Sequence, residues 1–369
     1  MKKILYITTL SRTINAFLVP HITSLSDKGN IVDCACNIDK DREIPKELRE
    51  RNVKFYDIPF TRNPLDINNI KAFKNLLKIQ NENNYDIIHV HTPIAAMYGR
   101  LLKVKFPKLK TIYTAHGFHF HKDAPLINWI VYYPIEKIMS RFTDVIITMN
   151  EEDHMMTKKF NVNETYKLNG VGLNLNHYNS EFFDKKQVRK KLGLSEDDFV
   201  IVMIAEVNKN KNHKQMIDAI KVLKDKGIEI KVLCLDKGSL FENIKQYIKD
   251  IGLSENIKML GYRSNVNEII CACDIGILMS YREGLPRNIM ELMACKKPVI
   301  GTNIRGIRDL IKDGVNGYLV EVGDIKSTAE KIETLYNRRE LIDNMSDNAY
   351  ELIKDYSVDS IVRTLETIY

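Results

Sequence analysis

Residues 280–302 read SYREGLPRNIMELMACKKPVIGT, a segment that contains two glutamates, Glu283 and Glu291. The largely apolar run 274–279 before this segment predicts a buried strand, and the apolar residues 299–301 predict the next one. Between the two runs there is room for a loop and a short helix only. The segment therefore predicts a strand–loop–helix–strand unit of a parallel sheet.

The sequence also predicts where the two glutamates lie in this unit. A Gly-Leu-Pro turn ends at Pro286, and proline suits the first position of a helix because it has no backbone N–H to satisfy. We therefore expect a helix over 287–295, which Lys-Lys-Pro ends. Glu283 then lies in the loop after a strand, and Glu291 lies about one and a half turns into the helix.

This arrangement favours a particular kind of ligand. In an open parallel sheet, ligands bind beyond the carboxyl ends of the strands. The start of a helix offers unpaired N–H groups and the positive end of the helix dipole, which together attract phosphate. Glu283 can accept hydroxyls at the reacting end of a ligand, and Glu291 can accept hydroxyls further along. Two acids around a phosphate site suggest a sugar nucleotide.

The chain as a whole predicts two domains, since 369 residues are many for one core. Strands alternate with helices from residue 3 and again from residue 199, which predicts two doubly wound parallel sheets. The expected strands are 3–8, 31–36, 54–59, 85–91, 109–114 and 144–149, then 199–205, 230–236, 257–260, 275–279, 299–302 and 317–320. We expect domains over 1–172 and 199–356, joined by a polar linker, 173–198. The final helix is expected over about 326–355.

Charge is unevenly distributed along the chain. The formal net charge is +7, and residues 1–170 hold 25 Lys and Arg against 18 Asp and Glu, whereas residues 171–369 hold 30 of each. A basic first half favours nucleic acid, an anionic membrane face or a phosphate-bearing acceptor. No nucleic-acid-binding motif accompanies it, so nucleic acid is not expected. Residues 103–110, KVKFPKLK, read either as a membrane-interface segment or as a solvated helix end.

The first residues do not predict export. The apolar run in MKKILYITTL is too short for a secretory signal, and no cleavage site follows. No segment reaches the roughly 20 apolar residues that span a bilayer. We expect a cytoplasmic protein, either free or peripheral on the inner membrane face. The six cysteines, including the pairs at 34–36 and 271–273, lie in apolar surroundings and predict buried thiols rather than a metal site.

The pattern E-x7-E within REGLPRNIMELMACKKPVI resembles the signature of retaining glycosyltransferases of family 4, which have the GT-B fold. The resemblance implies two Rossmann-like domains that face a cleft and a C-terminal helix, 357–369, that returns to the first domain. It also implies that Glu283 contacts the donor sugar and Glu291 the ribose. The loop and helix start would complete the donor site with Gly284, Leu285, Pro286, Arg287 and Asn288.

A second block of the family surrounds Lys211. The resemblance implies that this lysine neutralises the donor diphosphate, where negative charge builds up as the sugar–phosphate bond breaks. Most members carry an arginine five residues earlier, where this chain has Glu206, and capsule-type members often carry a glutamate there. Lys209 or Arg287 could replace the missing cation. The segment Gly-Tyr-Arg ending at Arg263 resembles the one that frames the nucleobase.

Histidines cluster after two predicted strands of the first half. The segment TAHGFHF resembles a block of capsule and exopolysaccharide glycosyltransferases in which the histidine matching His116 contacts the donor sugar. His89, His91 and His119 are candidates for the acceptor, and His121 reads as a surface residue. A zinc site among these histidines remains an alternative, although family 4 enzymes need no metal.

Two departures concern the first strand. Many family members have a Gly-Gly in the loop after it, whereas residues 9–15 contain no glycine. Ser11 or Arg12 could substitute there, and Arg12 is a candidate for the acceptor. The D-x-D at 39–41 is formally the metal signature of another glycosyltransferase class, but it lies in a polar loop without further acidic ligands and reads as solvated.

The resemblance thus implies a retaining, metal-independent hexosyltransferase. Its donor would be a UDP-linked hexose or N-acetylhexosamine, and its acceptor an undecaprenyl-pyrophosphate-linked sugar in capsule or exopolysaccharide synthesis. We expect Glu283, His116 and Lys211 to be catalytic and no cofactor to be needed. The alternatives are a GT-B enzyme of other chemistry, such as a UDP-sugar epimerase, and a non-catalytic nucleotide-sugar-binding protein. A nicotinamide dehydrogenase is disfavoured because no G-x-G-x-x-G follows a predicted strand.

Overall fold

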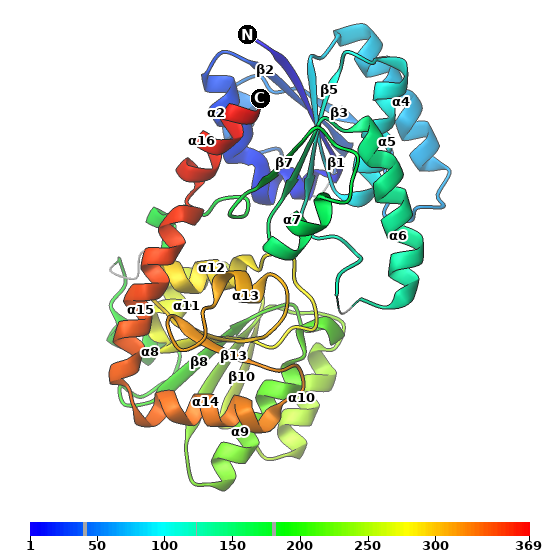
Figure 1. The fold of residues 1–369 in the computed structure, drawn as a ribbon. Coiled ribbons are helices and arrows are strands. Elements are labelled where there is room, and N and C mark those ends of the chain that lie inside the picture. The colour runs from blue at the N-terminus through cyan, green and yellow to red at the C-terminus, as the bar shows by residue number, and fades with distance from the viewer. Residues whose placement is uncertain (40–42, 123, 179–181) are drawn as a thin grey trace. The chain divides into compact units, whose positions relative to one another are not determined.

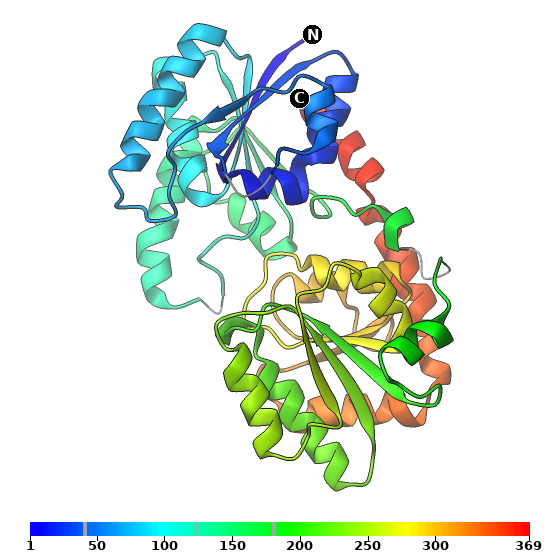
Figure 2. The same cartoon turned by 180° about the vertical axis from the view of Figure 1, so that it is seen from behind.

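The computed structural model describes residues 1–39, 43–122, 124–178 and 182–369 (Figures 1 and 2). The chain divides into two compact units. The first unit comprises Met1–Gly172 together with Val358–Tyr369, and the second comprises Leu173–Ser357. The predicted linker, 173–198, lies in the second unit, where it includes the helix α8 (Lys185–Lys191).

The first unit is built on a parallel sheet with the strand order β3-β2-β1-β4-β5-β6-β7. The direction of winding reverses between β1 and β4, which makes that point the topological switch of the sheet. Six of the strands were predicted, and β7 was not. The strands are β1 (Lys3–Leu10), β2 (Ile31–Asn37), β3 (Phe55–Asp57), β4 (Ile87–His91), β5 (Lys110–Ala115), β6 (Val145–Thr148) and β7 (Glu164–Lys167).

Helices cover both faces of this sheet, with α2 and α16 on one face and α4 and α5 on the other (Figure 1). Successive side chains of β1 point to opposite faces of the sheet, so the strand contributes to both hydrophobic cores. Ile4 and Tyr6 pack on the α2 face, and Leu5 and Ile7 pack on the α5 face. The helices are α1 (Ser11–Thr13), a π-helical turn (Ile14–Leu18), α2 (Val19–Asp27), α3 (Lys46–Glu50), α4 (Asn68–Asn83), α5 (Pro93–Lys105), α6 (Leu126–Met139), α7 (Glu151–Thr157) and α16 (Val358–Ile368).

The C-terminal helix α16 completes the core of the first unit. Its apolar residues Ile361, Leu365 and Ile368 are buried on the α2 face of the sheet. The hydroxyl of Tyr369 lies against the Tyr6 hydroxyl and His89 Nδ1. Residues 358–369 therefore belong to the interior packing of a unit whose other residues precede them by nearly 200 positions.

The second unit also has a parallel sheet, in the order β10-β9-β8-β11-β12-β13. Its strands all match predicted ones: β8 (Phe199–Ile204), β9 (Ile230–Leu235), β10 (Ile257–Gly261), β11 (Ile275–Leu278), β12 (Val299–Thr302) and β13 (Gly317–Val320). Figure 1 shows α9, α10 and α14 on one face of this sheet and α8, α11 and α12 on the other. These helices are α9 (His213–Asp225), α10 (Phe241–Asp250), α11 (Val266–Ala272), α12 (Arg287–Ala294), α13 (Ile307–Leu310) and α14 (Ile325–Asn337).

The prediction of one long final helix over 326–355 was wrong. The chain forms α14 and α15 (Glu340–Ile353), separated by a break at Arg338, whose φ and ψ are −124° and 67°. The two helices cover different parts of the unit, because α14 packs on α9 whereas α15 packs on α12. A single straight helix could not reach both. Within the described residues, no helix has the length and apolar content to cross a membrane.

Candidate functional site

The carboxyl edge of the second sheet brings two predicted residues together. Lys211 ends a 3₁₀ turn (Lys209–Lys211) after β8, and Glu283 lies in the loop after β11. The Lys211 Nζ atom lies 2.6 Å from Glu283 Oε1, and both side chains are largely buried. Since β8 and β11 are neighbours in the sheet, their carboxyl ends meet although the residues are 72 positions apart.

Polar neighbours fix the loop that carries Glu283. Ser280 Oγ donates a hydrogen bond of 2.6 Å to Glu283 Oε1, so this oxygen is bound by both Lys211 and Ser280. The loop is also tied to the β8 side, because the Tyr281 N–H donates to the Asn210 carbonyl oxygen at 2.8 Å. The carboxylate is thereby held in one orientation by residues from two strand ends.

A close backbone contact shapes the same loop. Gly306 has a φ of +79°, and a Cβ atom there would lie 2.2 Å from the Gly284 carbonyl oxygen. Only glycine allows this approach. Arg305, beside it, donates from Nε to the Glu283 carbonyl oxygen at 3.3 Å. The segment after β12 therefore supports the loop between Glu283 and α12, which the sequence analysis did not predict.

The second glutamate has its own partners. Glu291 Oε1 accepts hydrogen bonds from the Tyr178 hydroxyl at 2.7 Å and from Arg287 Nε at 3.1 Å. Burial and the neighbouring Glu291 carboxylate raise the pKa of Tyr178, so its hydroxyl stays neutral and donates. Tyr178, which was not predicted, comes from the segment assigned to the linker.

The helix that carries Glu291 is α12, and its start matches the prediction closely. Pro286 occupies the N-cap position rather than the first helical position, and no side chain caps the helix. Asn288 Nδ2 donates to the Ile204 carbonyl oxygen at 2.6 Å, which fixes the helix start to the end of β8. Leu285 packs against the core of the unit. The first turn of α12 thus lies at the same sheet edge as Lys211 and Glu283.

The loop that carries Lys211 is held by two asparagines. Asn208 Oδ1 accepts the Lys211 N–H at 3.1 Å, and Asn212 adopts the left-handed conformation before α9. His213 follows at the start of α9 and is buried, and desolvation together with the charge of Lys211 lowers the pKa of His213 to about 4. With His213 neutral, the positive charges of this turn are those of Lys209 and Lys211.

Two other predicted donor residues are exposed. Glu206 follows β8 and is exposed. Arg263 follows β10, and its Nε donates to Asn265 Oδ1 at 3.3 Å. Neither side chain lies in the network of Glu283 and Glu291, so their roles stay predictions.

In the first unit, the structure brings three of the predicted histidines together. His89 and His91 lie on the same face of β4 with ring centroids 4.2 Å apart, and His91 Nδ1 lies 3.1 Å from His116 Nε2. Burial lowers the pKa of His116 to about 4, with a further contribution from His21. Burial likewise holds the pKa values of His89 and His91 well below the usual value. The three imidazoles are therefore neutral near pH 7.

His89 is part of the interior of the first unit. Its Nε2 atom bonds the Thr114 hydroxyl at 2.7 Å, and its Nδ1 atom contacts the Tyr369 hydroxyl. Both ring nitrogens therefore have partners within the unit. This placement gives the predicted contact of His89 with an acceptor no support.

The remaining residues of the first unit are spread over its surface and interior. His119 stacks on Tyr132 of α6 with centroids 4.6 Å apart, and Arg12 in α1 is exposed. The expectation that His121 lies on the surface was wrong, because it is buried. Trp129 Nε1 of α6 donates to its backbone carbonyl oxygen at 3.1 Å.

A strained residue marks the switch point of the first sheet. Thr92, directly after β4, has a φ of +65°, which is rare for a β-branched residue. Its hydroxyl lies 2.7 Å from that of Thr9 at the end of β1. Strained backbone is concentrated at functional sites. The proline that follows Thr92 is the one local feature of the sequence that accompanies this strain.

The other sequence features have these outcomes. All six cysteines are buried free thiols, as predicted. Over the described ranges, no group of three or more His, Cys, Asp or Glu side chains is arranged to hold a metal ion.

The D-x-D prediction falls at 39–41, of which 40 and 41 lie outside the described residues. In the segment 103–110, Lys103 contacts Asp144 and Lys110 Nζ donates to the Ile368 carbonyl oxygen, whereas Lys105 and Lys108 are exposed.

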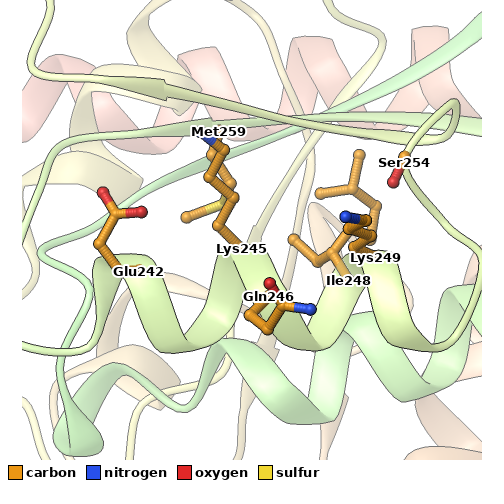
Figure 3. Close-up of a pocket in the computed structure, with 8 residues that line it drawn as sticks. Glu242, Lys245, Gln246, Ile248, Lys249, Ser254 and Met259 are labelled. Atoms are coloured by element: carbon orange, nitrogen blue, oxygen red, sulfur yellow. The ribbon is translucent and has the colours of Figure 1, made fainter.

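A pocket of about 430 Å³ lies beside α10 in the second unit (Figure 3). Five of its lining residues come from α10, and none of the predicted site residues contributes to it. The lining residues are Glu242, Lys245, Gln246, Ile248, Lys249, Ser254, Ile257 and Met259.

Comparison with known proteins identifies the class. Residues 184–352 match the family described as Glycosyl transferases group 1, and residues 3–150 match Glycosyl transferase 4-like. The two matches cover the greater part of both sheets. The chain belongs to the group 1, family-4-type glycosyltransferases, and it has their GT-B fold.

Individual relatives agree with this assignment. Putative glycosyltransferase EpsD of Bacillus subtilis is 35% identical over 100% of this chain and 96% of its own length. Capsular polysaccharide biosynthesis glycosyltransferase CapM of Staphylococcus aureus is 26% identical over 88% of this chain and 87% of its own. UDP-Gal:α-D-GlcNAc-diphosphoundecaprenol α-1,3-galactosyltransferase of Escherichia coli is 26% identical over 75% of this chain and 73% of its own length.

Among solved structures, Anabaena Alr3699/HepE in complex with UDP and glucose has a TM-score of 0.81. The two chains are 18% identical, and the alignment covers 100% of this chain and 99% of the other. At this identity the likeness shows the shared fold.

Proposed function

We propose that this glycosyltransferase retains the anomeric configuration and transfers a hexose or N-acetylhexosamine from a UDP-linked donor. The acceptor is a sugar linked to a lipid pyrophosphate such as undecaprenyl pyrophosphate, and the product serves capsule or exopolysaccharide synthesis. The observation that carries the proposal is the contact between Lys211 and Glu283 at the carboxyl edge of the second sheet.

Lys211 is the candidate ligand of the donor diphosphate. Its ammonium group lies at the start of α9 and at the edge where α12 also begins, so a diphosphate bound there would meet the positive charge of Lys211 and helix N-terminal N–H groups. Without a donor, Glu283 balances this charge. When the diphosphate binds, Lys211 exchanges the carboxylate for phosphate oxygens, and Glu283 becomes free to accept hydroxyls of the donor sugar.

Glu291 fits the ribose for a similar reason. Its carboxylate is oriented by Tyr178 and Arg287 through the same oxygen, Oε1. The other oxygen can accept hydroxyls, and paired ribose hydroxyls suit a carboxylate. In this arrangement Arg287 also brings a second cation to the helix start, which offsets the glutamate at position 206.

The reaction we propose is a front-face displacement. The bond between the anomeric carbon and the phosphate oxygen breaks, and the acceptor oxygen forms its bond on the same face. The acceptor proton passes to the departing phosphate oxygen, while Lys211 stabilises the negative charge on the diphosphate. His116, as a neutral imidazole, orients the donor sugar by hydrogen bonding.

The acceptor proposal draws on the relatives and on the basic first unit. The E. coli relative is named for a diphosphoundecaprenol acceptor, and a polyprenyl chain would keep the enzyme at the inner membrane face. His91, His119 and Arg12 remain candidates for acceptor contacts, and the switch point near Thr92 is where open sheets bind ligands. We also propose that neither metal nor cofactor is required.

The test is nucleotide release from a panel of UDP- and GDP-sugars, measured with EDTA present. We expect slow hydrolysis of one UDP-sugar by the unaltered protein and its loss in Glu283→Gln. Glu333→Gln is the matched control, since Glu333 forms a 2.6 Å pair with Lys226 elsewhere in the second unit. Proton NMR of the product with a lipid-linked acceptor then reports whether the anomeric configuration is retained.

Other outcomes would overturn the proposal in identifiable ways. Loss of turnover on adding EDTA, restored by a divalent metal, would show metal-dependent chemistry. Interconversion of the donor sugar without transfer would indicate an epimerase. Absence of binding to every nucleotide sugar would exclude both reactions.

A further inference from the structure

Helix α6 of the first unit presents an apolar face that no described residue covers. Successive residues of a helix are about 100° apart, so the exposed aliphatic side chains of α6 occupy one half of its circumference. They are Leu126, Ile127, Ile130, Val131, Ile135 and Ile138. Leu126, Ile130 and Ile138 keep 74%, 62% and 56% of their surface exposed. Polar residues normally occupy this position on a surface helix.

The opposite half of α6 is anchored in the unit. Trp129 and Tyr133 pack against Phe120, with ring centroids 5.6 and 5.4 Å apart. Glu136 is buried and accepts a hydrogen bond of 2.8 Å from Arg100. The exposed face is therefore held in a fixed orientation by a well-packed one. Single exposed apolar side chains are ordinary, but a contiguous set of this size marks an interaction surface.

Positive charges lie on this face and beyond its C-terminal end. Lys137 lies within it, and Arg141 follows the helix and is exposed. The neighbouring helix α5 packs against α6 and exposes Lys105 close to the exposed Val104. Within residues 126–141 the one acidic side chain is Glu136, which is buried against Arg100. The surface is thus aliphatic and cationic, without an exposed acid in that stretch.

We propose that the exposed face of α6 docks the enzyme on an anionic lipid bilayer. The helix has 14 residues, or about 21 Å, which is too short to cross a bilayer. It would lie in the plane of the interface, with its aliphatic side chains in the acyl region and its cations among lipid phosphates. Protein interfaces are richer in aromatic and arginine anchors, whereas this face is almost entirely aliphatic. Tyr132 at its margin suits the headgroup level.

This inference rests on the proposed function in one respect, since a lipid-linked acceptor requires the enzyme at a membrane. It names the surface that meets the membrane, which is separate from the donor residues of the second unit. UDP binding therefore serves as an independent readout. Vesicle binding without UDP binding would support the docking surface and contradict the proposed function. UDP binding without vesicle binding would support the proposed function and contradict the docking surface.

The experiment is flotation of the full chain with vesicles of phosphatidylcholine, with and without phosphatidylglycerol. We expect binding to the anionic vesicles that weakens with salt. The variant Ile127→Glu/Ile130→Glu should lower the partition coefficient about tenfold or more, since it places charges where two exposed aliphatic side chains would enter the acyl region. The matched control is Leu65→Glu/Ile67→Glu, because these apolar residues are 92% and 67% exposed in the same unit but lie outside α6.

Three results would overturn the inference. The first is absence of vesicle binding by the unaltered protein at low salt. The second is equal vesicle binding by the α6 variant and the unaltered protein. The third is a concentration-dependent dimer that the α6 variant converts into a monomer, which would assign the face to a second copy of the chain. Circular dichroism and UDP binding confirm that each variant is folded.

Discussion

The ammonium group of Lys211 lies 2.6 Å from Glu283 Oε1, so two residues expected to bind different parts of one ligand form an ion pair with each other. The ion pair compensates a charge that would be costly to bury alone. The Lys211 ammonium group is largely buried, and the Glu283 carboxylate compensates its charge. Under the proposed function, donor binding would exchange one anion for another, which costs less than creating a new buried charge.

This exchange predicts opposite effects of two substitutions on nucleotide affinity. Glu283→Gln should reduce sugar transfer by roughly 100-fold or more while leaving UDP affinity unchanged or tighter, because Lys211 loses its competitor. Lys211→Met should weaken UDP binding about 10- to 100-fold, the range for a hydrogen bond to a charged group. Titration calorimetry measures both. Lys226→Met is the matched control, and equal weakening by both site variants would contradict the exchange.

The support of the Glu283 loop by Gly306 gives a second prediction. Gly306→Ala should lower turnover roughly tenfold or more and destabilise the protein, since the new methyl group would collide with the Gly284 carbonyl oxygen. Gly314→Ala separates the two causes. Gly314 has a similar φ of +73° but open space around it, so its variant should show only the cost of the left-handed conformation, about 1–2 kcal/mol. Steady-state kinetics and urea unfolding compare the two.

The hydrogen bond between Tyr178 and Glu291 should affect nucleotide binding rather than the chemical step. We expect Tyr178→Phe to weaken UDP binding about three- to tenfold, since one hydrogen bond that orients the carboxylate is lost. Glu291→Ala should bind UDP and 2′-deoxy-UDP with similar, weak affinity. Tyr247→Phe is the control, because Tyr247 donates to Asp218 at 2.6 Å in the same unit. If Glu291→Ala still bound UDP more tightly than 2′-deoxy-UDP, Glu291 would not be the residue that recognises the ribose 2′-hydroxyl.

The buried histidines predict that the first unit loses stability on acidification. Burial lowers the pKa of His21 and of His116 to about 4, and it holds the pKa values of His89 and His91 well below the usual value. An unfolded histidine titrates near 6.5. Between about pH 6.5 and 4 the unfolded chain therefore binds more protons, and the free energy of unfolding falls as pH falls. Each histidine contributes up to about 1.4 kcal/mol per pH unit.

The single tryptophan, Trp129, lies in the first unit and reports its unfolding by fluorescence. Urea unfolding at several pH values should give a shallower pH dependence for His21→Gln than for the unaltered protein. A stability that stays constant from pH 6.5 to 5 would contradict the prediction.

Sequence patterns predicted most of the sheet residues, because buried parallel strands are continuous apolar runs bounded by turns. They failed where tertiary packing decides the local structure. Strand β7, with the polar sequence Glu164–Lys167, is at the sheet edge and lacks such a run. The break at Arg338 depends on which neighbours α14 and α15 cover, and no local signal at that position competes with the helical pattern.

The candidate site was predictable to the extent that it follows strand ends. Glu283, Glu291 and Lys211 lie at the carboxyl edge that the pattern indicated, but the direct contact of Lys211 with Glu283 depends on the pairing of β8 with β11. Tyr178 and Arg305 were missed because their partners are distant in sequence. The burial of His121 was missed because its contact with Trp129 joins a loop to α6 and no local pattern indicates it.

The return of residues 358–369 to the first unit has a consequence for how the protein is made. During synthesis the second unit, 173–357, emerges before the helix that completes the first. Until then the apolar surface around Leu25 and Tyr6, which α16 covers, has no partner from the same chain. The first unit therefore cannot reach its final packing before residues 358–369 have been synthesised. A nascent chain stalled before residue 358 should bind chaperones and resist folding even though 172 of its residues belong to that unit.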